Sequence, residues 1–229
     1  MSNWLQRPAT ETQITQGQRL WLYILGAVIM LFLVAPTLIV IPMSFSASQY
    51  LEFPPQEWST KWYQHYFESS EWMAATLASF KIAILTTIVA TPLGVMAAYG
   101  LHGSGARANR MIFMLLITPM MIPLILVAIG AFYVYVKLKI LYSLASLVLA
   151  HTVLALPLVV IVTASALKSY DMNQEMAARS LGASRLKAFM TVTLPQIRFA
   201  VITGALLSFL TSFDEVVVAL FISGGENAT

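Results

Sequence analysis

The sequence predicts an all-α protein whose helices cross a membrane several times. Composition gives the first indication, because 59% of the 229 residues are hydrophobic, only 10% are charged, and the mean hydropathy is +0.77. An ordinary globular chain carries roughly 25% charged residues. The second indication is that the charges gather between long apolar stretches, each able to form a membrane-spanning helix. These two observations exclude a soluble fold.

Five apolar stretches are long enough to be spans, since a helix needs roughly 20 residues to cross about 30 Å of hydrocarbon. The expected spans are about 20–43, 74–101, 111–136, 140–167 and 199–222. The first is too long for a signal-peptide core and lacks a small-residue cleavage site near its end, so we interpret it as a retained helix. The predicted organisation is an N-terminal segment, 1–19, followed by a single transmembrane domain, 20–229.

The orientation follows from the charges between the spans, because Lys and Arg are enriched in cytoplasmic loops. Basic residues precede the first span, separate the second from the third, and separate the fourth from the fifth. They are Arg7, Arg19, Arg107, Arg110, Lys168, Arg179, Arg185, Lys187 and Arg198. The loop 44–72 instead carries four Glu and six Trp or Tyr residues. We therefore expect the N-terminus and residues 168–198 in the cytoplasm and loop 44–72 outside, with Lys137 and Lys139 as exceptions to the rule.

Several classes of site are excluded by what the sequence lacks. It contains no cysteine, so disulfides and thiolate metal sites are ruled out. No cluster of His, Asp and Glu has the spacing of a metal or acid–base site, and no G-x-x-x-x-G-K-[ST] phosphate loop is present. Nothing suggests a nucleic-acid partner. We expect no metal, no catalytic residue and no cofactor in this chain.

The cytoplasmic segment 168–198 begins with signals for a short helix. Asp171 followed by Gln174 has the spacing of a capping box, in which two side chains satisfy the first backbone N–H groups. Glu175 and Arg179 are four residues apart, a favourable spacing for an ion pair on a helix surface. These residues predict a helix that starts near Asp171.

The same segment then turns into a second short helix. Gly182 should end the first helix, because glycine reaches the left-handed conformation that commonly terminates helices. Ser184 can cap the next helix, and Pro195 should kink or stop it. The segment is therefore predicted to be a helical elbow.

The elbow resembles the cytoplasmic EAA loop of permease subunits in binding-protein-dependent ABC importers. The family pattern reads E-A-A, three residues, G, nine residues, I, one residue, L-P. The corresponding residues are Met176, Ala177, Ala178, Gly182, Val192, Leu194 and Pro195. Val192 for Ile is a mild departure. Met176 replaces the usual Glu, while Glu175 stands one residue earlier and would point about 100° away around the helix.

Further stretches carry the same resemblance. "LLITPMMIPLILVAIGAFYVY" resembles the Pro-containing third span of the family, and "SFLTSFDEVVVALFISGG" is similar to the fifth span of its polyamine (spermidine and putrescine) branch. The resemblance implies the type I importer fold and a multi-pass subunit of the bacterial cytoplasmic (inner) membrane, with its N-terminus in the cytoplasm. It also implies a sixth span, which we expect beyond Thr229.

The resemblance further implies a set of partners. In such importers a soluble periplasmic or extracellular binding protein delivers the solute to two permease subunits in the bilayer. Two cytoplasmic ATPase subunits, which bind ATP and Mg, drive the transport, and the EAA loop docks in a cleft of the ATPase. Polyamine systems generally use two different permease chains, although the sequence leaves an identical copy open.

The expected function is that of a non-enzymatic permease subunit for a small cationic solute, a polyamine. Asp214 and Glu215, far along the fifth span, are the candidate residues of the substrate path, because two acids at that depth are costly unless they face water or a cation. Asp214 is favoured, since its shorter side chain reaches the membrane surface less easily. The alternative is that the span ends early and the pair is merely solvated at the outer mouth.

Other functions remain open at this point. A secondary transporter driven by an ion gradient usually shows two related halves, and five spans with one elbow do not divide in that way. A membrane-bound enzyme would need an acid–base or metal cluster. An ABC importer for an amino acid or another amine has no feature against it. His151 lies inside the fourth span, and we expect it to hydrogen-bond a neighbouring helix, with a functional role as the alternative.

Overall fold

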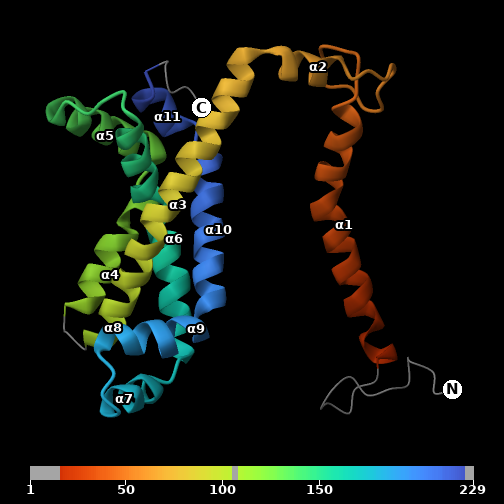
Figure 1. The fold of residues 1–229 in the computed structure, drawn as a ribbon. Helices are drawn as coiled ribbons and strands as arrows, with labels where there is room; N and C mark the ends of the chain where they lie inside the picture. The colour runs from red at the N-terminus through yellow and green to blue at the C-terminus, as the bar shows by residue number, and fades with distance from the viewer. Residues whose placement is uncertain (1–15, 105–107, 225–229) are drawn as a thin grey trace. The chain divides into compact units, whose positions relative to one another are not determined.

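The structure, a computed structural model, describes residues 16–104 and 108–224, and helices dominate both of its compact units (Figure 1). The units are Met1–Ser70 and Glu71–Thr229. Three described helices are long and apolar enough to span a membrane, namely Gly17–Met43, Ser70–Gly103 and Leu144–Ser169. Two bent pairs of helices raise the number to five if each pair is one span. The all-α prediction is confirmed, whereas Arg7 and Arg107 lie outside the described residues.

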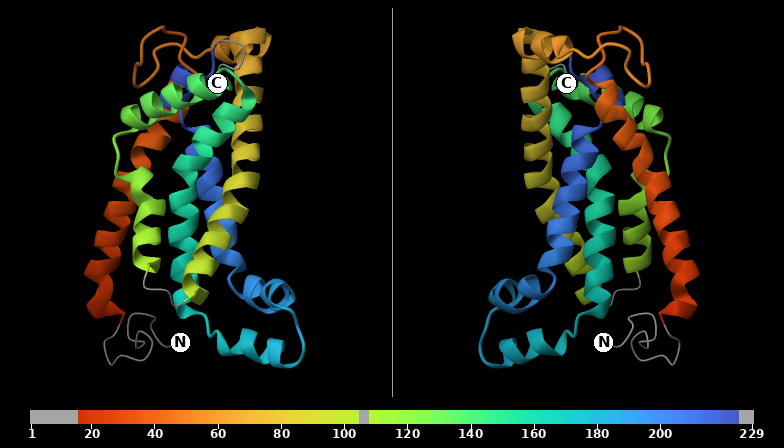
Figure 2. Two further views of the ribbon diagram at one scale, coloured as in Figure 1. Left: turned by 90° about the vertical axis from the view of Figure 1, so that its left-hand side faces the viewer. Right: turned by 90° about the vertical axis from the view of Figure 1, so that its right-hand side faces the viewer.

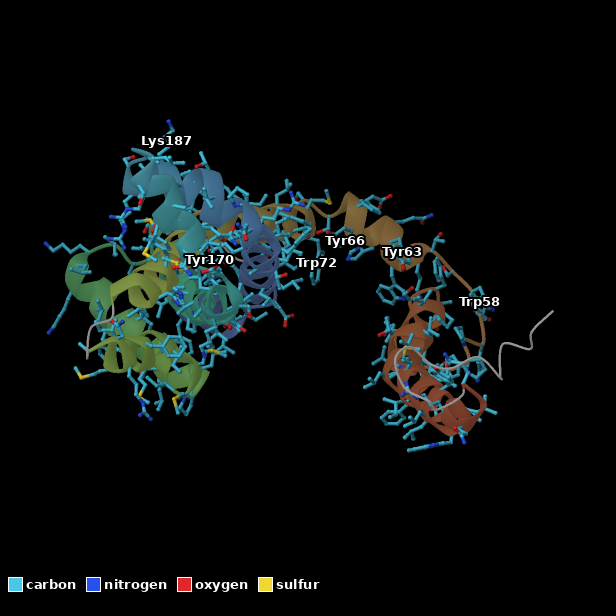
Figure 3. The ribbon with its side chains drawn as sticks, turned by 90° about the horizontal axis from the view of Figure 1, so that it is seen from below. Trp58, Tyr63, Tyr66, Trp72, Tyr170 and Lys187 are labelled. Atoms are coloured by element: carbon cyan, nitrogen blue, oxygen red, sulfur yellow. The ribbon has the colours of Figure 1, made fainter. Side chains whose placement is uncertain are left out.

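The first unit contains one long apolar helix and a folded loop. The short η2 (Gly17–Arg19) leads into α1 (Leu20–Met43), which covers the residues of the first expected span. The loop after α1 is closed by an antiparallel bridge between Ser46 and Trp58, and it leads into α2 (Lys61–Glu68). The rings of Phe45 and Tyr63 pack with their centroids 5.3 Å apart. Figure 3 labels Trp58 in this loop and Tyr63 in α2.

Three helices run side by side in the second unit: α3 (Ser70–Ser104), α6 (Leu144–Ser169) and α10 (Arg198–Phe213) (Figure 2). They meet closely at Val159 of α6. A Cβ added to Gly94 of α3 would lie only 2.6 Å from Val159 Cγ1, and one added to Gly204 of α10 would lie 3.3 Å from it. Small residues at such crossings allow helix backbones to approach in a membrane. Val159 is therefore the packing centre of the three helices.

The third expected span, 111–136, is not one helix. It consists of α4 (Asn109–Ile117), the short η3 (Thr118–Met120) and α5 (Leu124–Leu138), with a bend of 99° between the two parts. Pro119 and Pro123 lie at the break. Proline removes a backbone donor and its ring clashes with the preceding turn, so two prolines four residues apart end the first helix and begin another.

The fourth expected span begins later than predicted, at Leu144 instead of residue 140. Lys139 and Tyr142 adopt positive φ values of 56° and 64°, which no continuing helix allows. Ser143 then caps α6, because its Oγ accepts a hydrogen bond from Ser146 N at 3.1 Å. The turn between α5 and α6 is thus defined by backbone conformation and a cap, neither of which hydropathy reveals.

The fifth expected span, 199–222, is also interrupted. The helix α10 ends at Phe213, and α11 (Val217–Ile222) follows after a break at residues 214–216. Val218 and Ile222 of α11 are buried in a core that α3, α5 and α6 complete with Ile82, Ala128 and Leu147. The two acidic residues therefore lie between two helices and not within one.

Candidate functional site

The predicted elbow is present at the end of the bundle where α6 leads into it and α10 leaves it (Figure 2). Its first helix is α7 (Asn173–Ser180). The second helix of the elbow is a continuous run of three segments: α8 (Arg185–Ala188), the π-helical η4 (Phe189–Thr193) and α9 (Leu194–Gln196). The chain then bends by 80° into α10, directly after the turn that contains Pro195.

The corner of the elbow has the predicted backbone. Gly182 adopts a φ of 91°, in the left-handed region that favours glycine. Gly182 N donates to Arg179 O at 3.0 Å, and Ala183 N donates to Ala178 O at 3.1 Å. This pair of bonds is the Schellman motif, which satisfies the last carbonyls of α7. Ser184 caps α8 as expected, since its Oγ accepts from Lys187 N at 3.3 Å.

The predicted start of α7 is wrong in detail. Met172 occupies the N-cap position, and Asp171 Oδ1 accepts a hydrogen bond from Asn173 N at 3.0 Å. The side chain of Gln174 bonds that of Gln196 on α9 and so does not complete a capping box. Gln174 thus pairs with Gln196 of the second elbow helix instead of with the backbone at the start of α7.

Glu175 is directed into the protein. Its side chain is 1% exposed. Its Oε1 accepts a hydrogen bond from the hydroxyl of Tyr99 at 2.6 Å, and its Oε2 accepts one from Thr193 Oγ1 at 2.6 Å. The predicted surface pair with Arg179 is therefore wrong, because the carboxylate faces α3 and η4 while Arg179 is exposed. Sequence reasoning missed Tyr99 and Thr193, which no local pattern connects to Glu175.

Met176, the next residue of α7, points about 100° away from Glu175 and is 51% exposed. Two further large apolar side chains of the elbow are still more exposed, Leu181 at 90% and Leu186 at 69%. Of the other residues of the EAA pattern, Ala177 and Pro195 are exposed, whereas Ala178, Val192 and Leu194 are half-buried. In Figure 3, Lys187 of α8 projects outward from the same region. The leucines could have been found as apolar residues in an otherwise polar segment.

The two acids of the α10–α11 break have different surroundings. Glu215 precedes Val216, the N-cap residue of α11, and its Oε1 accepts a hydrogen bond from Val218 N at 2.8 Å, so its side chain caps the first turn of α11. Asp214 is exposed, and it lines an open cleft of about 530 Å³ together with Phe213, Thr211, Leu210 and Glu215. Of the two acids, only Asp214 thus presents an exposed carboxylate that forms no hydrogen bond among the described residues.

The aromatic ring of Phe213 lines this cleft. The ring of Phe213 packs against that of Phe80 on α3, with centroids 4.9 Å apart, and against that of Phe209, with centroids 5.7 Å apart. An exposed carboxylate beside an aromatic ring can attract a cation both by charge and through the face of the ring. The cleft is therefore suited to an amine.

His151 is buried near the α10–α11 break. Its side chain is 1% exposed, and its Nδ1 lies 2.8 Å from Ser212 Oγ on α10. Ser212 Oγ in turn lies 3.3 Å from Thr86 Oγ1 on α3. The expected hydrogen bond to a neighbouring helix is confirmed. Within the described residues, no group of three or more His, Asp or Glu could hold a metal ion.

The comparison with protein families agrees with this geometry. The family model described as "binding-protein-dependent transport system inner membrane component" matches residues 90–228, which include the elbow and the acidic break. The chain belongs to this family. It is 32% identical over 198 residues to the spermidine/putrescine transport system permease protein PotC of Haemophilus influenzae, with 86% of this chain and 76% of that protein covered.

Two further similarities support the assignment. The chain is 34% identical over 200 residues to the putrescine transport system permease protein PotI of Escherichia coli K12, covering 84% of this chain and 71% of that protein. It also superposes on a chain of a bacterial ABC transporter involved in the import of the acidic polysaccharide alginate. The TM-score there is 0.71 at 16% identity, with 95% of this chain and 79% of that chain covered.

The chain is therefore a multi-pass permease subunit of an ABC importer, which decides against a secondary transporter. Its relatives are permease subunits and not enzymes. Family membership implies, in general, a partner permease, an ATPase and a soluble binding protein.

Proposed function

We propose that this chain forms, together with a second and different permease subunit, the inner-membrane path of a polyamine importer. Two relatives are named as permease proteins of spermidine/putrescine and putrescine transport systems, and these names support this substrate class. The fold alone does not support a polyamine substrate, because an importer of an acidic polysaccharide has the same fold. The substrate must therefore be argued from the cleft.

The observation that carries the proposal is the difference between the two acids. Glu215 is engaged as the cap of α11, whereas Asp214 turns an exposed carboxylate to the cleft that the ring of Phe213 also lines. A di- or triamine offers positive charges that match a carboxylate and an aromatic face. An acidic solute would be repelled by the same residues. These contacts support Asp214 as the substrate-binding acid of the pair.

The test is uptake of radiolabelled putrescine and spermidine by cells that express the complete transporter. Asp214→Asn keeps the side-chain shape and removes the charge. Hydrogen bonds to charged groups contribute about 1.5 to 3 kcal/mol, so we expect uptake efficiency to fall about tenfold or more. Glu215→Gln keeps an oxygen that can accept the Val218 N–H, and we expect a smaller loss. Wild-type uptake by both variants at equal expression would remove the pair from the substrate path.

The elbow is proposed to couple transport to two cytoplasmic ATPase subunits, which bind ATP and Mg. The exposed side chains of Met176, Leu181 and Leu186 support a docking surface, because large apolar side chains gathered on a polar segment mark interaction sites. Leu181→Asp should abolish ATPase binding and transport, whereas Leu181→Ala should weaken both less. Co-purification of the ATPase with each variant measures this, and normal recovery with Leu181→Asp would contradict the docking role.

The proposed orientation places the N-terminus and the elbow in the cytoplasm and loop 44–72 outside. A soluble periplasmic or extracellular binding protein would deliver the solute to that outer side. The absence of cysteine in the sequence allows a direct test with single cysteines at Lys187 and Glu57. A membrane-impermeant maleimide added to intact spheroplasts should label Glu57→Cys and spare Lys187→Cys. The reverse pattern would contradict the orientation.

A further inference from the structure

We propose that Glu175 is a positioning residue that fastens the elbow to the cytoplasmic end of α3 and does not contact the ATPase. Glu175 forms a clasp with Tyr99 and Thr193, defined here as the carboxylate and the two hydroxyls that it joins. This inference deepens the proposed coupling function and rests on it. It adds α3, a helix that is not adjacent to the elbow in the chain, to the part of the subunit that moves with the elbow.

The geometry of the clasp is that of a buried carboxyl group whose two oxygens both have hydrogen-bond partners. An ionised carboxylate can only accept hydrogen bonds, and each hydroxyl supplies one donor. Both oxygens of Glu175 are used, at 2.6 Å each, a distance typical of O–H···O⁻ bonds to a charged acceptor. Tyr99 is separated from Glu175 by 76 positions and Thr193 by 18, so the carboxylate ties α3 and η4 to α7. Such a bond pattern fixes where α7 lies.

The surroundings of Tyr99 extend the attachment. The Arg185 guanidinium lies over the Tyr99 ring at 5.3 Å, and the Phe189 ring packs against it with centroids 4.6 Å apart. The hydroxyl of Tyr170, just after α6, lies 3.2 Å from Thr193 Oγ1. The end of α3, the end of α6 and both helices of the elbow therefore meet at one cluster.

The position of Glu175 argues against a direct contact with a partner. The side chain is 1% exposed, and adjacent residues of a helix point about 100° apart, so the neighbouring Met176 is the one that faces outward. Contact between Glu175 and an ATPase would require α7 to leave α3 and two hydroxyls to lose their acceptor. The surface that a partner can reach is formed by other residues.

The clasp gives the elbow a mechanical connection to the cleft. A helix of eight residues such as α7 is not stable by itself, so its position depends on tertiary contacts. Tyr99 lies near one end of α3, and Phe80, which packs against Phe213 in the cleft, lies about 28 Å away along the same helix at 1.5 Å per residue. Movement of the elbow with α3 as one body would displace Phe80, which packs against the Phe213 ring that lines the cleft.

The clasp can be tested with conservative variants in the complete transporter reconstituted in nanodiscs. Tyr99→Phe and Thr193→Val each remove one donor and keep the shape, and Glu175→Gln removes the charge. The matched control is Thr191→Val, because this exposed threonine of the same π-helical segment bonds only within its own helix, to Lys187 O at 2.7 Å. Spin labels at His102→Cys on α3 and Asn173→Cys on α7 report the distance between the two helices.

We expect a narrow distance distribution in the wild type and in Thr191→Val, and a broad one in Tyr99→Phe, Thr193→Val and their double variant. ATPase subunits should still co-purify, and ATP hydrolysis should continue. Transport per ATP hydrolysed should fall about fivefold or more in the double variant, the lower end of ordinary coupling factors. This split between hydrolysis and transport distinguishes positioning from a general loss of structure.

Two results would overturn the proposal. One is an unchanged distance distribution and an unchanged transport-to-hydrolysis ratio in the double variant. The other is a loss of ATPase binding in Glu175→Gln with an unchanged distribution, which would make Glu175 a docking residue. The coupling function itself is judged separately by Leu181→Asp. If that variant transported normally, coupling through the elbow would be wrong, and the spin-label distances alone would decide whether the clasp exists.

Discussion

His151 Nδ1 on α6 lies 2.8 Å from Ser212 Oγ on α10, so the end of α10 is held by a buried hydrogen bond two residues before Asp214. Thr86 extends the contact to α3. Three helices thus share a polar contact inside an apolar bundle. The arrangement ties the last turn of α10, beside the acidic break, to α6 and α3.

Removal of this hydrogen bond should cost little, whereas removal of the imidazole should cost much. Ser212→Ala loses two interhelical contacts, to His151 and to Thr86, and such bonds in membrane proteins average about 0.6 kcal/mol each. His151→Ala also leaves a cavity, for which about 2 to 5 kcal/mol is typical. Unfolding of the purified chain by SDS measures both. Ser165→Ala, an exposed change on the same helix, is the control, and equal costs for Ser212→Ala and His151→Ala would contradict the argument.

Gly94 should not tolerate a side chain. A Cβ there would lie 2.6 Å from Val159 Cγ1, and overpacking of this kind costs about 1 to 3 kcal/mol. Gly94→Ala should therefore lower the free energy of unfolding in SDS, and Val159→Ala in the same chain should restore part of it. Gly100→Ala on α3 is the matched control, because no atom lies within 4 Å of its added Cβ. Wild-type stability of Gly94→Ala would show that the helices do not approach this closely.

Gly182→Val should impair coupling while membrane insertion survives. At a φ of 91°, a β-branched residue is strained by more than about 1 kcal/mol, and the corner of the elbow would lose its Schellman geometry. We expect lower transport at normal levels of protein in the membrane. Gly182→Asn is the matched variant, because asparagine tolerates left-handed conformations better than valine does. The idea fails if valine and asparagine give the same wild-type transport.

Glu215 and Asp214 should differ in their effect on stability as well as on uptake. Glu215→Ala removes the acceptor of Val218 N at the start of α11, and loss of a helix cap costs typically about 1 kcal/mol. Asp214→Ala should leave stability near that of the wild type, since no hydrogen bond of its side chain is present among the described residues. SDS unfolding of the two variants measures the difference. A greater destabilisation by Asp214→Ala would reverse the assignment of the cap.

Features of local origin could be predicted from the sequence. The bounds of α1 follow from an apolar stretch between charges, and the left-handed Gly182 and the cap at Ser184 depend on residues close in the chain. Features that depend on distant partners could not. The spacing of Glu175 and Arg179 indicated a surface pair, but Tyr99, 76 positions away, holds the carboxylate inside. Hydropathy found the third and fifth apolar stretches but not their breaks. The break in the third lies at Pro119 and Pro123, which the sequence shows, whereas the break in the fifth depends on a backbone turn and a side-chain cap, which are not hydrophobic signals.

The break between α4 and α5 restricts how the subunit can face its surroundings. If this bent pair is one span, the chain between Thr118 and Pro123 leaves the regular helix at membrane depth. Hydrocarbon offers no hydrogen bonds, so non-helical backbone there is tolerated only against other protein or water. Met121 and Ile122 at the break are exposed within this chain. In that case acyl chains cannot solvate this side of the second unit, and other protein or an aqueous passage must lie against it.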